Sequence, residues 1–276
     1  MSGILYVVAT PIGNLEDLSP RARKTLGEVD LIAAEDTRHT RRLLMHIGCK
    51  TRLLALHDHN EERATGSIVK SLLDGESVAL VSDAGTPLVS DPGFRLVREA
   101  HKNGIAVSPI PGASAVTAAL SAAGIATDRF CFEGFLPSKQ AARRAALAGL
   151  AGEQRTLVFY EAVHRISESL DDMATAFGAD RQAFVGRELT KMHEQCVRDT
   201  LGAISDMLRN DAIPHKGEFV IVVGGAAQQA TSDAEVDSLL LALADKMPTR
   251  EAAAIAAQFT GHRKNELYDR LLQLRK

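Results

Sequence analysis

Short apolar runs alternate with helical stretches through the first half of the chain, and this alternation constrains the fold more than any other feature. The clearest run, residues 78–81, has four consecutive apolar residues, as in a strand that is buried on both faces. Similar runs cover residues 4–9, 31–34, 52–56 and 106–110. Strands separated by helices of about ten residues predict right-handed strand–helix–strand units and a parallel sheet.

Turns of small residues follow two of these runs. Residues 78–87 end in SDAGTP, and residues 106–115 end in PGASA. In open α/β sheets, ligands lie beyond the carboxyl ends of the strands, where small residues let the backbone come close. Ordinary βα turns have the same composition, but the two turns also suit a pocket for a small polar molecule. Asp91 and Pro92 then predict the start of the next helix, with Asp91 as its N-cap.

After Gly124, consecutive strands replace the regular alternation. We expect the strands of this part at residues 129–133, 156–160, 183–185, 195–200 and 218–223. Strands without a helix between them predict a mixed sheet, and therefore a second domain. The Ala- and Arg-rich run 138–150 is expected to form a solvent-facing helix.

These patterns predict an α/β protein with three parts. We expect an N-terminal α/β domain with a parallel sheet at residues 1–124 and a second α/β domain with a mixed sheet at residues 125–227. A small polar linker at 228–232 would then lead to a C-terminal helical module at residues 232–276.

The C-terminal module carries a charge opposite in sign to that of the whole chain. From Pro248 to Lys276 there are six Lys or Arg and three acidic residues, a balance of +3, whereas the whole chain has a net charge of −3. Two short helices around a turn at Gly261, with Arg263 and Lys264 opening the second helix, resemble a helix-turn-helix. A module that docks nucleic acid and a simple helical cap on the domain therefore both fit.

Composition argues against several classes of protein. Aromatic residues make up 4% and Trp is absent, so a stacking platform for single-stranded RNA is not expected. The net charge argues against a uniformly basic surface but allows a local basic patch. Cys49, Cys131 and Cys196 are far apart and odd in number, which predicts buried small hydrophobic residues in a reducing compartment. No apolar run approaches membrane-spanning length, so we expect a cytoplasmic protein without a membrane partner.

Several common site motifs are absent from the sequence. There is no G-x-G-x-x-G after the first strand and no G-x-x-x-x-G-K-[ST], which removes the usual dinucleotide and triphosphate cradles. The GASAV sequence from Gly112 lacks the final glycine of a G-x-S-x-G nucleophile elbow. His57 and His59 form only a loose pair, so no metal site is predicted.

The motifs that are present follow one another in the order of a known family. They are VATPIGNL at 8–15, AEDTR at 34–38, VSDAGTP at 81–87, PGASA at 111–115, FEGFLP at 132–137, FYE at 159–161 with His164 and Arg165, and GRELTK at 186–191. In this combination the chain resembles the tetrapyrrole methylase superfamily and, within it, the ribosomal RNA small-subunit methyltransferase I family, over nearly its whole length. Ala84 stands where the tetrapyrrole enzymes carry proline, which favours the RNA branch.

The resemblance implies S-adenosylmethionine as the cofactor, held in a cleft between two α/β domains, usually in a homodimer. It implies methyl transfer to the ribose 2′-hydroxyl of a cytidine in the decoding region of 16S ribosomal RNA, with the small ribosomal subunit as the partner. The residues that it implies for cofactor binding are Pro11, Asp83, Ala84, Gly85, Ser114, Ala115, Tyr160 and Glu161.

Several charged side chains at strand ends are candidates for the chemistry. A ribose hydroxyl is a poor nucleophile, so a positioned base or a charge that stabilises the forming alkoxide is expected. The candidates are Asp36 with Arg38 beside it, Glu133, Glu161, His164 and Glu188. Cations next to Asp36 and Glu188 in the sequence would keep these two acids ionised, which suits them better to orienting a substrate. For each acid, a structural ion pair is an equally good interpretation.

Basic residues near the strand ends could contact phosphates. The candidates are Arg38, Arg41, Arg42, Arg165, Arg187 and Lys191 in the two domains, and Arg250, Arg263 and Lys264 in the tail. Each could equally be a solvated surface charge, and we expect the tail to dock RNA without touching the methyl donor. Two other functions stay open: a methyltransferase for a tetrapyrrole, corrinoid or similar small molecule, and a non-enzymatic regulator that senses a metabolite and binds nucleic acid.

Overall fold

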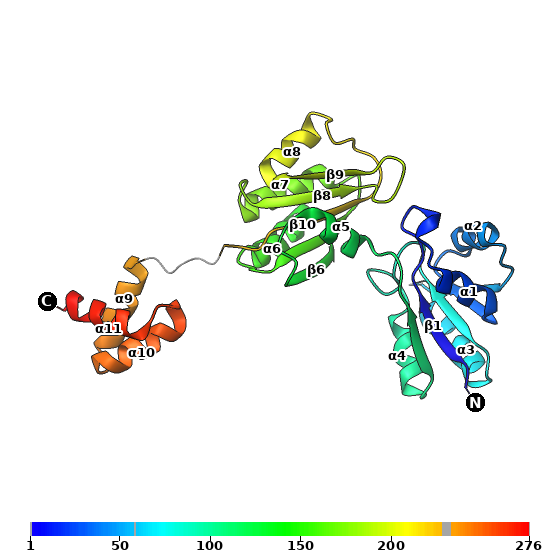
Figure 1. Ribbon diagram of the computed structural model, residues 1–276, viewed down its shortest axis with the longest axis horizontal. Coiled ribbons are helices and arrows are strands. Elements are labelled where there is room, and N and C mark those ends of the chain that lie inside the picture. Colours follow the sequence, from blue (N-terminus) through cyan, green and yellow to red (C-terminus); the bar gives the residue numbers. More distant parts are fainter. Residues whose placement is uncertain (1, 58, 228–232, 276) are drawn as a thin grey trace. The chain divides into compact units, whose positions relative to one another are not determined.

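The chain folds into a larger unit with two β-sheets and a smaller helical unit (Figure 1). The computed structural model describes residues 2–57, 59–227 and 233–275, and the predicted linker at 228–232 lies outside them. The larger unit is Met1–Gly225 and the smaller one is Ala226–Lys276. Among the described residues, no helix is both long and apolar enough to cross a membrane.

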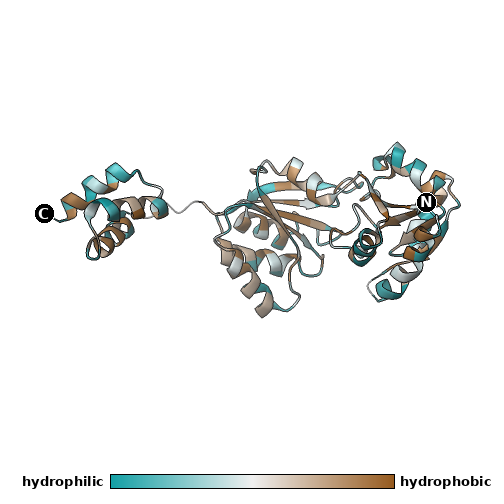
Figure 2. Ribbon diagram, turned by 90° about the horizontal axis from the view of Figure 1, so that it is seen from below, coloured by the Kyte–Doolittle hydropathy of each residue, from teal (hydrophilic) through white to brown (hydrophobic). Residues whose placement is uncertain are grey.

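The first sheet is parallel throughout, as the alternating pattern predicts. Its strands run in the order β3-β2-β4-β1-β5. They are β1 (Ile4–Val8), β2 (Leu31–Ala34), β3 (Arg52–Ala55), β4 (Val78–Val81) and β5 (Ala106–Ile110). Hydrophobic residues dominate most of the strands (Figure 2), and β2 and β4 of this sheet are buried along their whole length.

Helices cover both faces of the first sheet. They are α1 (Pro20–Glu28), α2 (Thr37–Ile47), α3 (Glu61–Leu73) and α4 (Phe94–Lys102), with a short 3₁₀ helix, η1 (Leu15–Asp17), before α1. Val78 and Leu80 of β4 pack with α3 and α4, whereas Ala79 and Val81 pack with α1 and α2. Because successive side chains of a strand point to opposite faces, burial on both faces explains the unbroken apolar run in β4.

The start of α4 differs from the prediction. Asp91 does not cap this helix, which begins at Phe94. Instead, Glu61 Oε1 at the start of α3 accepts hydrogen bonds from the backbone N–H groups of Gly93 (3.1 Å) and Arg95 (3.0 Å). A carboxylate from another helix thus satisfies the N–H groups that a local N-cap would otherwise bind.

The second sheet is mixed, as predicted. Its strands run in the order β6-β7-β10-β8-β9, in which the β6–β7 pair is parallel and the other three pairs are antiparallel. They are β6 (Phe130–Phe135), β7 (Thr156–Glu161), β8 (Gln182–Arg187), β9 (Gln195–Thr200) and β10 (Phe219–Val223). The helices of this part are α5 (Ala115–Ala123), α6 (Gln140–Leu150), α7 (Ile166–Phe177) and α8 (Leu201–Arg209).

Two of these helices differ from the sequence interpretation. Helix α5, which the predicted boundary near Gly124 assigns to the N-terminal domain, packs against β8, β9 and β10 of the second sheet. Helix α8 was not predicted. The hydroxyl of Thr200 caps it by accepting from the N–H of Ala203 (3.3 Å), and Ile204 and Leu208 are buried in the core.

Helix α6 is exposed along most of its length, as predicted, but Arg143 is completely buried. Its guanidinium donates to Asp172 (2.7 Å) and Glu168 (3.1 Å) of α7, and Arg144 binds the other carboxylate oxygen of Asp172 (2.7 Å). A buried guanidinium needs such partners because removing its charge from water is costly. The ion-pair network therefore joins α6 to α7 on one side of the helix, while the rest of α6 stays exposed.

The C-terminal unit has a hydrophobic core of its own. It contains α9 (Asp233–Ala244), α10 (Thr249–Thr260) and α11 (Lys264–Leu274). A turn joins α10 to α11 at Gly261, whose φ of 73° is a left-handed conformation that favours glycine. The helix–turn–helix arrangement that the sequence predicts is therefore present.

The basic residues of this unit divide into two groups. Arg270 donates to both Asp233 and Asp237, and Arg275 donates to the carbonyl oxygen of Ala244, so these two cations join the helices of the module. The other described basic residues are exposed, namely Arg250, Arg263 and Lys264, together with Lys246, which pairs with Asp245 (3.5 Å). The charge available for an external partner therefore comes from this second group.

The three cysteines are free, and one of them is not buried as predicted. Cys49 and Cys131 are partly buried, whereas Cys196 is exposed. Cys196 lies on β9 at the edge of the second sheet, where alternate side chains face away from the core. The prediction of burial is therefore wrong for this residue.

Candidate active site

Three loops meet at the carboxyl end of the first sheet. The N–H of Thr10 donates to the carbonyl of Gly85 (2.8 Å), and the N–H of Gly85 donates back to Thr10 (3.1 Å). Thr86 Oγ1 donates to the carbonyl of Ala113 in the loop after β5 (3.1 Å). Gly85 has a φ of 81°, and a Cβ at this position would lie only 3.2 Å from Cγ2 of Ile12. Glycine is therefore required where the loops come together.

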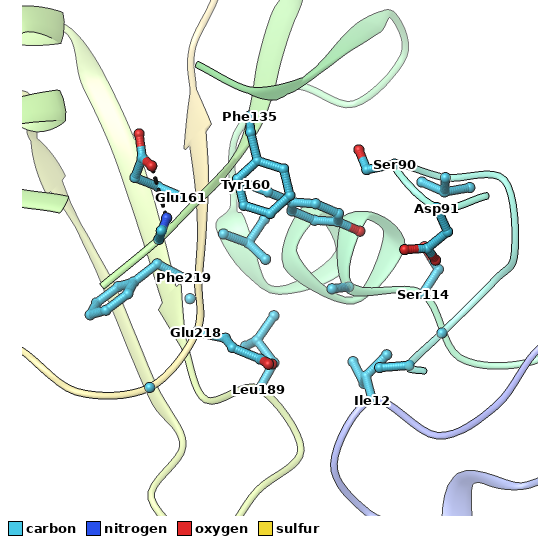
Figure 3. A pocket seen from close by; sticks show the side chains of 18 of the residues that line it. Ile12, Ser90, Asp91, Ser114, Phe135, Tyr160, Glu161, Leu189, Glu218 and Phe219 are labelled. Carbon is cyan, nitrogen blue, oxygen red and sulfur yellow. Dashed lines mark hydrogen bonds between the residues drawn. The ribbon is translucent and has the colours of Figure 1, made fainter. Parts of the chain in front are cut away.

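A cavity of about 440 Å³ lies beside these loops and is called the first cavity here. Side chains and backbone of the first lobe (the parallel sheet and its helices) and of the second lobe (the mixed sheet and its helices) line it (Figure 3). The lining includes Ile12, Ala84, Gly85, Ser90, Asp91, Ser114, Ala115, Phe135, Tyr160, Leu189, Glu218 and Phe219. An apolar cavity of this size with a few polar groups is typical of a site for a small organic ligand.

Tyr160 forms one wall of the first cavity. Its ring makes edge contacts with Phe132 and Phe135, at centroid distances of 4.8 and 5.6 Å. Figure 3 shows its hydroxyl pointing toward the side of the cavity where Asp91 and Ser114 lie. Burial, together with the negative charge of Asp91, raises the pKa of Tyr160 to about 12. Tyr160 is therefore a neutral phenol that can donate a hydrogen bond at physiological pH.

Asp91 is a cavity residue that the sequence motifs did not indicate. It lies between β4 and α4, in a segment where Leu88 and Ser90 have φ values of 73° and 66°. Such values are uncommon for residues other than glycine and turn the chain sharply. The turned segment brings Asp91 to the first cavity (Figure 3). Its carboxylate gives a largely apolar lining a negative charge, which favours a cationic ligand.

The start of α5 contributes polar groups to the first cavity. Ser114 occupies the N-cap position, but its side chain makes no capping hydrogen bond. The first N–H groups of a helix have no partners within the helix, so they can bind a ligand. Ser114 and Ala115 therefore offer a hydroxyl and backbone donors without bulky side chains.

A second cavity of about 320 Å³ shares Ile12, Ala84 and Glu218 with the first. Its other lining comes from the loop after β1, from one side of α2, from the loop after β4 and from the second lobe. These residues include Pro11, Gly13, His39, Thr40, Arg42, Ser82, Asp83 and Lys191. The residues implied for cofactor binding therefore do not all line the same cavity. Pro11 and Asp83 lie at the second cavity, and the other six residues line the first.

Glu161 borders the first cavity, but its carboxylate already has three donors. Oε1 accepts from the N–H of Ala162 (2.8 Å) and from Arg165 (2.7 Å), and Oε2 accepts from Ser169 Oγ (2.6 Å). The residue is only 2% exposed. This geometry supports the ion-pair interpretation of Glu161 and Arg165 over roles in catalysis or phosphate binding.

Asp36 and Glu188 are also paired with cations. Asp36 binds Arg38 through both carboxylate oxygens (2.7 to 3.2 Å) and caps α2, and the bonds to Arg38 hold its pKa well below the usual range. Burial acts to raise the pKa of Glu188, but hydrogen bonds from Lys191 and the N–H of Glu218 outweigh it and lower the pKa. Both acids are therefore weak bases, as the sequence indicates.

Four more predicted site residues lie away from both cavities. Arg187 is buried and donates to the carbonyl oxygens of Lys216 (2.6 Å) and His193 (3.0 Å), so its guanidinium is not presented to phosphate. Glu133 and His164 are exposed and line neither cavity. Arg41 is exposed on α2, and its neighbour Arg42 reaches the second cavity.

Several residues of the cavity lining were not predicted from the sequence. Phe135 and Leu189 stand inside quoted motifs, so their positions in the sequence were already marked. Asp91 and Glu218 carried no such signal, because the turn at Ser90 and the pairing of the two lobes are not visible in local patterns. Among the described residues, no cluster of three or more His, Cys, Asp or Glu side chains could hold a metal ion.

Comparison with known proteins agrees with this architecture. The family model for tetrapyrrole (corrin/porphyrin) methylases matches residues 4–205, and the model for the RsmI C-terminal HTH domain matches residues 230–275. Uroporphyrin-III C-methyltransferase from Thermus thermophilus, solved in complex with S-adenosyl homocysteine, has a TM-score of 0.57 and 17% identity. The similarity covers 80% of this chain and 97% of that one, and it supports the fold.

Two relatives are similar along nearly their whole length. The ribosomal RNA small subunit methyltransferase I of Xylella fastidiosa (strain Temecula1) is 54% identical over 96% of this chain and 98% of its own. The protein of the same name from Pseudomonas aeruginosa is 51% identical over 99% of this chain and 98% of its own. The chain therefore belongs to the tetrapyrrole methylase family and, within it, to the ribosomal RNA small subunit methyltransferase I family.

Proposed function

We propose that the chain transfers a methyl group from S-adenosylmethionine to the ribose 2′-hydroxyl of a cytidine in the decoding region of 16S ribosomal RNA. The observation that carries this proposal is the 54% identity, over almost the full length, to a ribosomal RNA small subunit methyltransferase I. The match of the tail to a helix-turn-helix model supports an RNA partner within the small ribosomal subunit. A cytoplasmic homodimer is part of the same proposal.

The first cavity fits the methyl donor. Its volume of about 440 Å³ lies within the range of cavities that enclose ligands of this size. Gly85 and Ala115 leave room for the backbone to approach a ligand, and Ile12 and Leu189 supply apolar walls. Asp91 supplies the negative charge that suits a sulfonium cation.

Binding and alignment are the chemical contributions that we assign to the first cavity. S-Adenosylmethionine supplies an activated methyl group, which is transferred in an in-line displacement, so alignment of donor and acceptor at short distance has a large effect on the rate. We propose that Ala84, Gly85, Ser114 and Ala115 hold the donor through backbone groups and the Ser114 hydroxyl. Tyr160 would act as a neutral hydrogen-bond donor, because its pKa is raised to about 12.

The tail is proposed to dock RNA. Arg250, Arg263 and Lys264 are exposed, and such side chains contact phosphates without reading sequence. The separate core of the C-terminal unit supports folding of residues 2–225 without it. Truncation after Gly225 should therefore weaken RNA binding and leave the affinity for S-adenosylmethionine unchanged. An equal loss of both affinities would reject this role of the tail.

A transfer assay tests the proposed activity. The protein is incubated with methyl-labelled S-adenosylmethionine and, in parallel, 30S particles, free 16S RNA, a tetrapyrrole or duplex DNA. We expect label in the RNA of the 30S particle, recovered as 2′-O-methylcytidine after digestion to nucleosides. Label in the tetrapyrrole would instead identify a small-molecule methyltransferase. Binding to DNA without any transfer would identify a regulator.

A further inference from the structure

The second cavity lies against the first. The two cavities share Ile12, Ala84 and Glu218, so a group bound in one would lie next to a group bound in the other. Both cavities have more apolar than polar lining, but the second is also lined by polar and charged side chains of α2, namely His39, Thr40 and Arg42. The second cavity therefore has polar groups of its own, from an element that does not line the first.

Arg42 brings an uncompensated positive charge to the second cavity. No hydrogen bond or ion pair joins its exposed side chain to another described residue. The nearby cations differ, because Arg38 binds Asp36 and Lys191 binds both Glu188 and Glu218. A guanidinium at the edge of a cavity that forms no ion pair with a carboxylate of the described chain suits a phosphate of an RNA strand.

Thr40 supplies an independent indication of a polar ligand. It is 2% exposed and lines the second cavity, and its hydroxyl has no hydrogen-bond partner among the described residues. Buried hydroxyls nearly always form a hydrogen bond. A buried hydroxyl at a cavity wall that has no partner in the protein can therefore form its hydrogen bond with a ligand. A sugar hydroxyl or a phosphate oxygen is a suitable partner.

The second lobe closes this cavity from the opposite side. A Cβ on Gly13 would lie 2.3 Å from Cγ of Lys191 and 3.0 Å from Oγ1 of Thr190, so glycine lets the loop after β1 lie directly against the second lobe. The cavity of about 320 Å³ is therefore bounded by both lobes, next to the donor cavity. Its size suits one nucleotide.

We propose that the second cavity receives the acceptor nucleotide of the RNA, with Arg42 bound to a backbone phosphate and Thr40 hydrogen-bonded to the sugar–phosphate unit. This inference rests on the proposed function, because it assumes that RNA is the acceptor. It assigns the acceptor site to one side of α2, and it gives Thr40 and Arg42 roles in substrate binding. Neither residue is needed to bind the donor.

Matched substitutions test both contacts. Arg42→Ala is compared with Arg23→Ala, which removes an exposed arginine of α1 that lines neither cavity. Thr40→Val is compared with Thr65→Val, because Thr65 is also buried, is also unpaired at Oγ1 and lines neither cavity. For each variant we would measure KM and kcat for 30S particles, the affinity for 30S particles without donor, the affinity for S-adenosylmethionine by calorimetry, and Tm.

The expected pattern separates binding from folding. Arg42→Ala should weaken the affinity for 30S particles about tenfold and lower its salt dependence, while Arg23→Ala has no such effect. Thr40→Val and Thr65→Val should both keep or raise Tm, because each removes an unpaired buried hydroxyl, but only Thr40→Val should raise KM. Affinity for S-adenosylmethionine should stay unchanged in all four variants.

Two results would overturn the inference, and neither can be confused with failure of the proposed function. Arg42→Ala and Thr40→Val could each match their controls in KM and in affinity for 30S particles. Alternatively, either variant could lose affinity for S-adenosylmethionine, which would assign the second cavity to the donor. Failure of the proposed function would be seen separately, as wild-type protein that binds S-adenosylmethionine but transfers no methyl group to RNA.

Discussion

Replacement of Glu161 by Ala distinguishes a structural acid from a catalytic one at the edge of the first cavity. The change removes the carboxylate that accepts from Ala162, Arg165 and Ser169. Arg165 would keep its bond to the carbonyl of Leu136 (3.2 Å) but would lose its ion-pair partner, although its side chain is only 15% exposed. We therefore expect the second lobe to be destabilised.

The magnitude follows from the burial of this ion pair. Removal of one partner from a buried pair leaves an uncompensated charge and typically costs about 3–5 kcal/mol. With a urea m value of about 3 kcal/mol/M, the midpoint of unfolding should fall by about 1–1.7 M. Glu161→Gln keeps the shape and most of the hydrogen bonds, so its midpoint should lie between those of wild type and Glu161→Ala.

Urea unfolding followed by far-UV circular dichroism measures this effect. Glu153→Ala is the control, because it breaks an ion pair with Arg155 in the same lobe, whose side chain is 41% exposed. Its midpoint should move much less than that of Glu161→Ala. An unchanged midpoint for Glu161→Ala, together with a large fall in kcat, would refute the structural assignment and restore a catalytic one.

Three further predictions concern acid stability, donor binding and the tail. Burial acts to raise the pKa of Asp172, but hydrogen bonds from two arginines of α6 outweigh it and lower the pKa, so its stabilisation is present above about pH 4 and is lost as the pH falls further. The free energy of unfolding, measured in urea titrations, should therefore fall less between about pH 5 and about pH 3 for Asp172→Asn than for wild type. An equal fall in both proteins would contradict this. Asp91→Asn should weaken binding of S-adenosylmethionine about tenfold in a calorimeter with little change in Tm, whereas undiminished affinity would exclude Asp91 from the donor site. Reversal of charge at Arg250, Arg263 and Lys264 should reduce the slope of log affinity against log salt for 30S particles by about 2, and an identical slope would show that the tail makes no phosphate contacts.

The sheets were predictable because their pattern is local. Residues 78–81 are apolar without interruption, and the structure buries them on both faces of β4. The mixed second sheet followed from strands that are consecutive in the sequence. Helix α8 was missed even though Thr200 stands in the sequence as a cap. Its few apolar residues at helical spacing lie between two strands and were too short a pattern to predict a helix.

The functional side chains were less predictable, because partners distant in the sequence decide their roles. The sequence predicts that Asp91 caps a helix, but in the structure Glu61 from another helix accepts the hydrogen bonds at that helix start. Arg187 looks like a phosphate contact, but two backbone carbonyls bind its buried guanidinium. Glu161 stands at a strand end, a position shared by catalytic and structural acids, and only its donors reveal which one it is. Small residues such as Gly85 were easier to predict, because close approach of the backbone demands them.

A crystal structure of the protein with S-adenosylhomocysteine would show whether the first cavity is the donor site. We expect the ligand in the first cavity, in contact with Gly85, Ala115 and Tyr160 and near the carboxylate of Asp91. The second cavity should remain free for the acceptor, with Arg42 and Thr40 at its wall. A ligand bound in the second cavity, or anywhere outside the first, would contradict the account.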